Sequence, residues 1–225
     1  MSLPFQPSLY IFDCDGTLTD TEVLNNQACA DAIAACGFPQ YDLEYCMTNF
    51  VGVAMSEIKR RIEMEHTTVL PDTFIPNFIN LVCERMDDTL PPVPGAVAAA
   101  LHIAQTTLTC VASNGERNNV IKSLKMIGLL DHFGESHVFT KGQVARGKPF
   151  PDLFLFAADA MRADPKRCVV VEDSVAGVTA GAAAGMHVIG ITAVSHDKQR
   201  ATELLRRAGA DAVFDDWAAI LDYIS

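Results

Sequence analysis

Short apolar segments that alternate with helical segments constrain the fold of this chain more than any other feature. The first, Leu9–Phe12, is an aromatic and β-branched run that leads directly into Asp13, and Gly16 follows shortly after. This pattern is typical of a buried strand that ends in a turn. Further strand-like runs occur at residues 108–112, 137–140, 168–171, 187–191 and 212–214. Because helical patterns separate these runs, the sequence predicts an α/β fold with a parallel sheet covered by helices on both faces.

The stretch from residue 19 to residue 90 differs from the rest of the chain. It contains helical patterns but no clear strand, and its helices are expected to break at Gly52, Pro71 and Pro76. Residues 91–95 read Pro-Pro-Val-Pro-Gly, which is typical of a stiff connector. The sequence therefore predicts a catalytic core formed by residues 1–18 and 91–225, and a helical insert of residues 19–90.

The charge and composition limit the possible partners. The net charge is −11, which opposes a nucleic-acid partner because such a surface needs a basic stripe. No apolar run approaches the roughly 20 residues of a membrane helix, and Met1–Pro7 lacks the basic and apolar parts of a signal peptide. We expect a soluble cytoplasmic protein without membrane or nucleic-acid partners, as a monomer or a weak dimer.

The seven cysteines form no Cys-x-x-Cys pair, and several have apolar neighbours, as Cys110 and Cys168 do. We expect buried free thiols in a reducing compartment rather than a disulfide framework. Cys14 lies between two acids, and the alternation of side chains along a strand predicts that it faces away from them.

Polar clusters follow three of the predicted strands, namely Asp13 with Asp15, Ser113 with Asn114, and Glu172 with Asp173. Ligands of parallel sheets bind outside the carboxyl ends of the strands, so these clusters are expected to converge. Close carboxylates repel one another unless protons or a cation compensate them. Hard oxygen ligands favour Mg²⁺. The sequence therefore predicts a magnesium site among the carboxylates Asp13, Asp15, Glu172 and Asp173.

These residue types suit the cleavage of a phosphate ester. Asp13 is the expected nucleophile, because a carboxylate can accept a phosphoryl group that water later removes. Asp15 is the expected general acid and base. Lys148, in a loop stiffened by prolines, is expected to stabilise the charge of the transition state. Ser113 and Asn114 are expected to bind phosphate where a strand turns into a helix.

Four segments occur in a characteristic order: Asp13–Asp20 (DCDGTLTD), Ser113–Gly115 (SNG), Gly147–Asp152 (GKPFPD) and Val171–Ser174 (VEDS). Together they resemble the four motifs of the haloacid dehalogenase superfamily, most closely its phosphatase and β-phosphoglucomutase-like branch. The resemblance covers essentially the whole chain. It implies a Rossmann-like core, a mobile helical cap that closes over the substrate, and Mg²⁺ bound by Asp13, the backbone carbonyl of Asp15, Asp173 and, directly or from outside, Glu172. Expected phosphate or substrate contacts also include Thr17, Gly115 and Asn25.

Departures from related families narrow the expected reaction. Asp15 favours phosphate-ester chemistry, because the dehalogenases and phosphonatases of this superfamily lack the second acid. Similar sugar phosphomutases carry a His about twelve residues after the nucleophile and an Arg in the cap, whereas this chain has Asn25 and no Arg in residues 52–56. We expect a phosphatase for a sugar phosphate or a similarly small phosphorylated metabolite. A β-phosphoglucomutase-like phosphomutase is the alternative, and a non-catalytic phosphometabolite-binding protein is disfavoured because both Asp13 and Lys148 are present.

Overall fold

The structure is a computed structural model that describes residues 3–51, 53–88 and 90–225. The chain divides into two compact units. The first unit combines Met1–Asp20 with Pro91–Ser225, and the second comprises Thr21–Leu90. The polar clusters described above all belong to the first unit.

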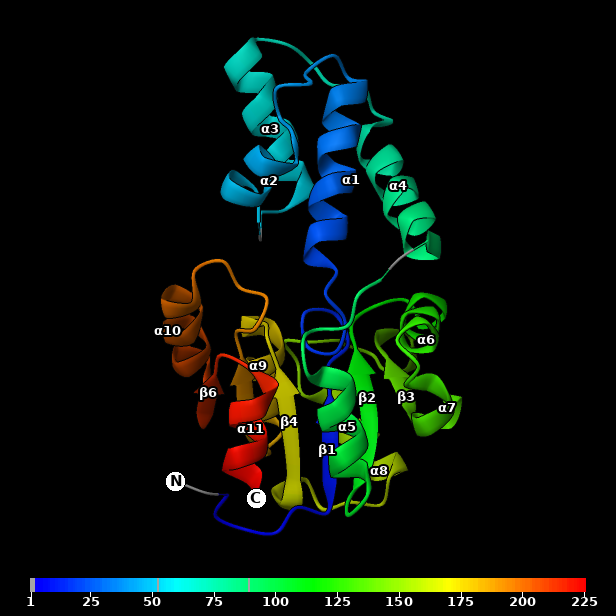
Figure 1. The fold of residues 1–225 in the computed structure, drawn as a ribbon, viewed down its shortest axis with the longest axis vertical. Helices are drawn as coiled ribbons and strands as arrows, with labels where there is room; N and C mark the ends of the chain where they lie inside the picture. Colours follow the sequence, from blue (N-terminus) through cyan, green and yellow to red (C-terminus); the bar gives the residue numbers. More distant parts are fainter. Residues whose placement is uncertain (1–2, 52, 89) are drawn as a thin grey trace. The chain divides into compact units, whose positions relative to one another are not determined.

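The first unit contains a six-stranded parallel sheet with the strand order β3-β2-β1-β4-β5-β6 (Figure 1). Its strands are β1 (Leu9–Phe12), β2 (Leu108–Ser113), β3 (Val138–Thr140), β4 (Cys168–Glu172), β5 (His187–Ile191) and β6 (Ala212–Phe214). Every residue of β1 and β4 is buried, which explains their continuous apolar sequences. The predicted α/β class with a Rossmann-like parallel sheet is confirmed.

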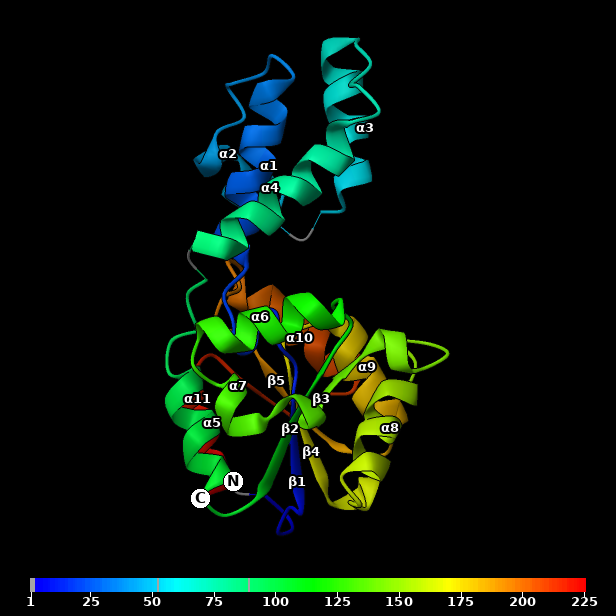
Figure 2. The same cartoon turned by 90° about the vertical axis from the view of Figure 1, so that its right-hand side faces the viewer.

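Helices cover both faces of this sheet, as Figure 2 shows. One face packs against α5 (Ala96–Ala104), α6 (Arg117–Met126), α7 (Leu130–Phe133) and α11 (Trp217–Ile224). The other packs against α8 (Asp152–Ala160), α9 (Val175–Ala183) and α10 (Lys198–Ala208). Side chains alternate between the two faces along β1, so Tyr10 and Phe12 pack against the first group of helices while Leu9 and Ile11 pack against the second.

The predicted strands agree with the structure to within one residue at each end. Not predicted were the short helix α7 and three single-turn 3₁₀ helices at Glu135–His137, Lys141–Gln143 and Pro165–Arg167. Such short elements leave little periodicity for a sequence pattern to reveal.

The second unit is helical, with α1 (Glu22–Ala35), α2 (Leu43–Asn49), α3 (Met55–His66) and α4 (Phe74–Asp88) around a core of its own. The expected break at Pro76 is wrong, because Pro76 lies in the first turn of α4. Proline is tolerated there since the first N–H groups of a helix need no intrahelical partner. Pro71 lies in the connection between α3 and α4, and Gly52 lies outside the described residues.

All seven cysteines are free, and Cys14, Cys29, Cys46, Cys110 and Cys168 are buried. The expectation of buried thiols is wrong for Cys83, which is exposed, and Cys36 is half-buried. Cys14 packs in the core beneath the sheet end, as predicted. None of the helices in the described ranges combines the length and the apolarity that a bilayer crossing requires.

Candidate active site

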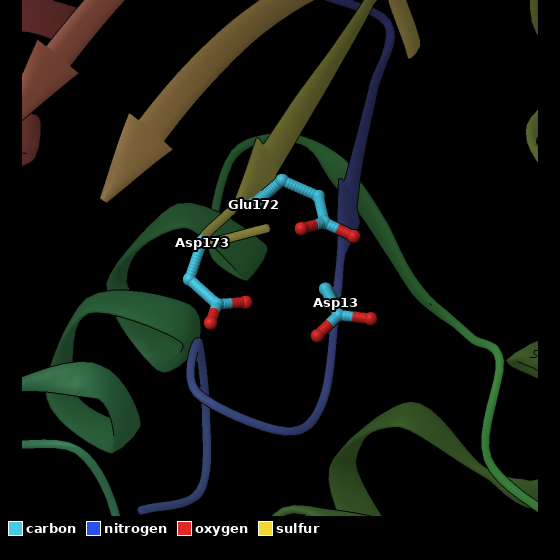
Figure 3. A group of neighbouring side chains, drawn as sticks. All are labelled: Asp13, Glu172 and Asp173. Atoms are coloured by element: carbon cyan, nitrogen blue, oxygen red, sulfur yellow. The ribbon is translucent and has the colours of Figure 1, made fainter. Parts of the chain in front are cut away.

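The sheet brings three of the four predicted acids together at the carboxyl ends of its central strands. Glu172 is the last residue of β4, and Asp13 directly follows β1. Since Phe12 pairs with Val171 and the amide of Asp13 donates to the carbonyl of Val171, Asp13 lies beside Glu172. Figure 3 shows the carboxylates of Asp13, Glu172 and Asp173 around one space, and one oxygen of each lies within 4.8 Å of the others.

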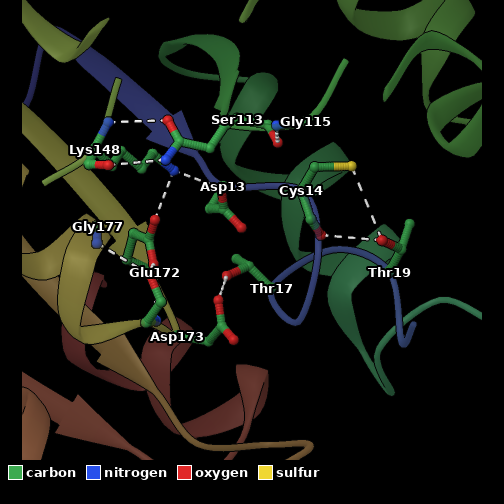
Figure 4. Close-up of polar contacts among 12 residues, drawn as sticks. Asp13, Cys14, Thr17, Thr19, Ser113, Gly115, Lys148, Glu172, Asp173 and Gly177 are labelled. Atoms are coloured by element: carbon green, nitrogen blue, oxygen red, sulfur yellow. Dashed lines mark hydrogen bonds and ion pairs between the residues drawn. The ribbon is translucent and has the colours of Figure 1, made fainter. Parts of the chain in front are cut away.

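Lys148 reaches this cluster from the connection between β3 and α8. Its ammonium nitrogen lies 2.5 Å from Oδ1 of Asp13 and 2.6 Å from Oε1 of Glu172 (Figure 4). The side chains of Lys148, Asp13 and Glu172 are only 3%, 9% and 1% exposed, so water screens these ion pairs weakly. The ammonium group also lies 4.9 Å from the ring centre of Phe154. A buried cation therefore sits beside the predicted nucleophile.

Burial dominates the electrostatics of the cluster. It raises the pKa of Asp13 to about 7, although the charge of Lys148 opposes the rise. The pKa of Asp173 lies well above its ordinary value because of burial and the nearby charges of Glu172 and Asp13. Burial alone would lower the pKa of Lys148, but Asp13 and Glu172 outweigh it and raise this pKa. Lys148 therefore stays protonated, but its single positive charge does not fully compensate the buried acids around it.

The donor set fits a hard divalent cation. The cluster contributes three carboxylates, and Lys148 supplies one compensating positive charge. With all groups ionised, two negative charges remain in a largely buried site, and the available ligand atoms are oxygens. Asp13 and Asp173 offer the ligand oxygens for such a cation.

Glu172 is tied to several protein groups. Its Oε1 atom accepts from Lys148, while Oε2 accepts from both the amide and the hydroxyl of Ser174 at 2.8 and 2.9 Å. The Ser174 hydroxyl in turn accepts from the amide of Gly177 and caps α9. A Cβ atom at Gly177 would collide with the Glu172 carboxylate. The close packing of the Ala/Gly-rich α9 beside β4 therefore also holds an acid of the site.

Asn114 holds the backbone of Lys148. Its Nδ2 atom donates to the carbonyl of Lys148, and its Oδ1 atom accepts from the amide of the same residue, both at 2.9 Å. Gly147 allows this approach, because a Cβ atom there would lie 2.5 Å from Oδ1 of Asn114. Ser113, the last residue of β2, accepts from the amide of Gly115 at 2.9 Å. The structure thus places Ser113, Asn114 and Gly115 at the site, and both side-chain bonds of Asn114 go to the Lys148 backbone.

The turn after β1 carries Asp15 and Thr17. Gly16 adopts a φ of +84° and passes so close to Asp173 that a Cβ atom would collide with its carboxylate. The hydroxyl of Thr17 donates to Oδ1 of Asp173 at 3.2 Å. Asp15 is exposed and lies outside the carboxylate cluster of the described residues. A Cβ atom at Gly115 would be 3.6 Å from its Oδ2, so the Asp15 carboxylate lies on the Gly115 side.

Asn25 is not among the residues that the first unit brings together. It is half-buried on α1, which belongs to the second unit. Sequence reasoning missed Ser174 and Gly177 as residues that contact Glu172. Ser174 had a detectable signal, since a serine directly before a helical pattern predicts an N-cap.

Comparisons with known proteins agree with this geometry. The family model for haloacid dehalogenase-like hydrolases matches residues 7–185. The 6-phosphogluconate phosphatase of Escherichia coli K12 is 35% identical over 188 residues, which cover 83% of each chain.

Two solved structures share the fold over nearly their whole length. A haloacid dehalogenase-like protein of Agrobacterium tumefaciens has a TM-score of 0.81 and 32% identity, covering 96% of this chain and 97% of that one. A HAD family hydrolase of Deinococcus radiodurans, solved with bound phosphate and sodium, has a TM-score of 0.80 and 31% identity, covering 95% and 93%. Because the family model matches residues 7–185, which is most of the chain, this chain belongs to the haloacid dehalogenase-like hydrolases.

Proposed function

We propose that this hydrolase is a Mg²⁺-dependent phosphatase that releases phosphate from a small phosphorylated sugar or sugar acid. One observation carries the proposal: the buried ammonium group of Lys148 bridges Asp13 and Glu172 at the sheet end, with the second acid Asp15 two residues after Asp13. The name of the Escherichia coli relative, a 6-phosphogluconate phosphatase, supports the substrate class.

In the first step, a carboxylate oxygen of Asp13 attacks phosphorus. The new bond joins Asp13 to the phosphoryl group, and the bond between phosphorus and the sugar oxygen breaks. Asp15 donates its proton to that departing oxygen. Lys148, held beside Asp13, stabilises the negative charge that spreads over the phosphoryl oxygens.

In the second step, water removes the phosphoryl group from Asp13. Asp15, now ionised, takes a proton from the water as its oxygen attacks phosphorus. The bond between Asp13 and phosphorus breaks, and inorganic phosphate leaves. The exposure of Asp15, and its place outside the carboxylate cluster, support a role in proton transfer by its side chain.

Asp13 and Asp173 would hold the Mg²⁺ ion, with Glu172 behind them. When bound, the ion supplies the positive charge that allows an anionic phosphate to approach a group of carboxylates.

A substrate panel tests this proposal. Phosphate release would be measured with 6-phosphogluconate, hexose phosphates, hexitol phosphates and nucleoside monophosphates, with Mg²⁺ or with EDTA. We expect the highest kcat/KM among the sugar and sugar-acid phosphates, and no turnover in EDTA. Turnover that persists in EDTA would overturn the role of the cation. Isomerised sugar phosphate without phosphate release, seen by ³¹P NMR, would instead identify a phosphomutase.

Two variants separate the roles of the acids. Asp13→Asn should abolish phosphate release, because an amide does not form the aspartyl-phosphate. Asp15→Asn should lower kcat by roughly 10²–10⁴-fold, the usual contribution of general acid–base catalysis, while the affinity for Mg²⁺ in calorimetry stays near that of the wild type. Active Asp13→Asn protein would disprove the nucleophile, and loss of Mg²⁺ binding in Asp15→Asn would contradict the role of Asp15.

A further inference from the structure

The single tryptophan of the chain, Trp217, lies beneath the turn that carries the acids. It is the first residue of α11 and is 1% exposed. Its ring packs against that of Phe12, with 5.8 Å between the ring centres. Phe12 is the last residue of β1 and directly precedes Asp13. The C-terminal helix thus contacts the strand from which the site begins.

A hydrogen bond joins Trp217 to the turn itself. Its indole Nε1 donates to the backbone carbonyl of Thr17 at 3.1 Å, although 200 residues separate the two. Both side chains are almost fully buried, so water does not compete for this bond. The indole N–H has no acceptor role, and a buried one without a partner would be unfavourable. The bond therefore fixes where the Thr17 backbone lies.

Thr17 has a second bond on the opposite side. Its hydroxyl donates to Oδ1 of Asp173 at 3.2 Å (Figure 4). One residue thus receives a hydrogen bond from α11 through its carbonyl and donates one to an acid of the site through its side chain. A shift of the Thr17 backbone would lengthen the bond to Asp173.

The turn has backbone hydrogen bonds of its own on both sides of Thr17, and the amide of Gly16 donates to the carbonyl of Thr19 at 2.7 Å. Gly16 takes a left-handed φ of +84°, a conformation that glycine leaves freely. The amides of Leu18 and Thr19 both donate to the carbonyl of Cys14. Thr17 itself is bonded to Trp217 through its carbonyl and to Asp173 through its hydroxyl.

We propose that Trp217 is a positioning residue: its indole N–H fixes Thr17 so that the Thr17 hydroxyl orients Asp173 toward the bound cation. This inference rests on the proposed function only in taking that cation as Mg²⁺. Groups outside the ligands themselves commonly set metal affinity, with losses of about 10–100-fold on mutation. Trp217 acts on Asp173 only through Thr17, so we expect its loss to weaken Mg²⁺ binding less than the loss of the Thr17 hydroxyl.

The test measures Mg²⁺ affinity by calorimetry in the full-length chain, independently of turnover. Trp217→Phe keeps an aromatic ring but lacks the N–H group, and we expect its Kd for Mg²⁺ to rise about 3–10-fold. Thr17→Val should raise Kd by about 10-fold. Both changes interrupt the same chain of contacts from Trp217 through Thr17 to Asp173. The double variant should therefore have a Kd for Mg²⁺ close to that of Thr17→Val alone. Ile220→Val, a buried change on the same helix, is the matched control and should lower Tm without changing Kd.

Several results would overturn the proposal. Trp217→Phe with a lowered Tm but the Kd of the wild type would show that the tryptophan only packs. A Thr17→Val protein with unchanged Kd would do the same, because this change removes the hydroxyl but nearly keeps the size of the side chain. Additive effects in the double variant would mean that Trp217 does not act through Thr17. Failure of the Mg²⁺ assignment gives a different result, since the wild type itself would then bind no Mg²⁺.

Discussion

The ammonium nitrogen of Lys148 lies 2.5 Å from Oδ1 of Asp13, although 135 residues separate them in the sequence. Both side chains are buried. Both the proposed reaction and the stability of the fold therefore depend on this ion pair, because neither charge has water as an alternative partner.

Removing the ammonium group of Lys148 should therefore lower both the stability of the fold and the rate of phosphate release. Lys148→Met leaves Asp13 and Glu172 as adjacent buried acids without their cation, and we expect a loss of about 3–5 kcal/mol in the free energy of unfolding without Mg²⁺. Phosphate release should fall at least about 100-fold. Urea unfolding and steady-state kinetics measure the two effects. Lys141→Met is the matched control: this exposed lysine pairs with Glu116 at 3.3 Å and should change stability by less than about 0.5 kcal/mol.

The double hydrogen bond between Asn114 and the Lys148 backbone predicts a kinetic effect. Asn114→Ala removes both bonds, so the loop that carries Lys148 loses its anchor. At roughly 1 kcal/mol for each bond, kcat/KM should fall about 10–30-fold. Asn118→Ala, an exposed position on α6, should behave as the wild type. An unchanged kcat/KM in Asn114→Ala would show that Lys148 keeps its position without this contact.

The contact between Gly177 and Glu172 predicts a loss of stability from a single methyl group. Gly177→Ala would place its Cβ atom in the Glu172 carboxylate, so the acid or the helix must move. Overpacking of this kind costs about 1–3 kcal/mol, and phosphate release should fall as Glu172 shifts away from Lys148. Gly142→Ala has open space around its Cβ atom and is the control. Equal thermal unfolding curves for the two variants would contradict this packing.

His187 predicts a pH dependence away from the site. Its Nε2 atom lies 3.2 Å from the Tyr223 hydroxyl, and its Nδ1 atom lies 3.5 Å from Asp211. Burial lowers the pKa of His187 below its ordinary value, although Asp211 opposes the shift. The unfolded chain therefore takes up the proton first as the pH falls through about 6.5, and the free energy of unfolding decreases toward the lower folded-state pKa.

The difference in stability between the wild type and His187→Gln isolates this contribution, because other groups titrate in both proteins. Urea unfolding at several pH values between 5 and 8 should show the wild type losing stability relative to the variant as the pH falls. A difference that stays constant over this range would mean that His187 titrates equally in the folded and unfolded chains.

The fold class and the clustering of the acids could be predicted from local patterns. Buried strands such as Leu9–Phe12 carry continuous apolar sequences, and parallel strands present their carboxyl ends at one edge. For this reason the sequence predicts that Asp13, Asp15, Glu172 and Asp173 converge. The structure clusters three of them, and the carboxylate of Asp15 lies outside the cluster of the described residues. The helical character of the second unit followed in the same way from its periodicity.

Partners that come from distant segments could not be predicted in this way. That the Asn114 amide holds the Lys148 backbone, and that Trp217 donates to Thr17, depends on which strands are neighbours and which helices pack beneath them. The type of each residue determines which hydrogen bonds its side chain can donate or accept. The sequence by itself therefore determined the available donors and acceptors and the order of the helices and strands. Only the tertiary structure decided which donor meets which acceptor, because contacts across as many as 200 residues form when the sheet and its helices pack together.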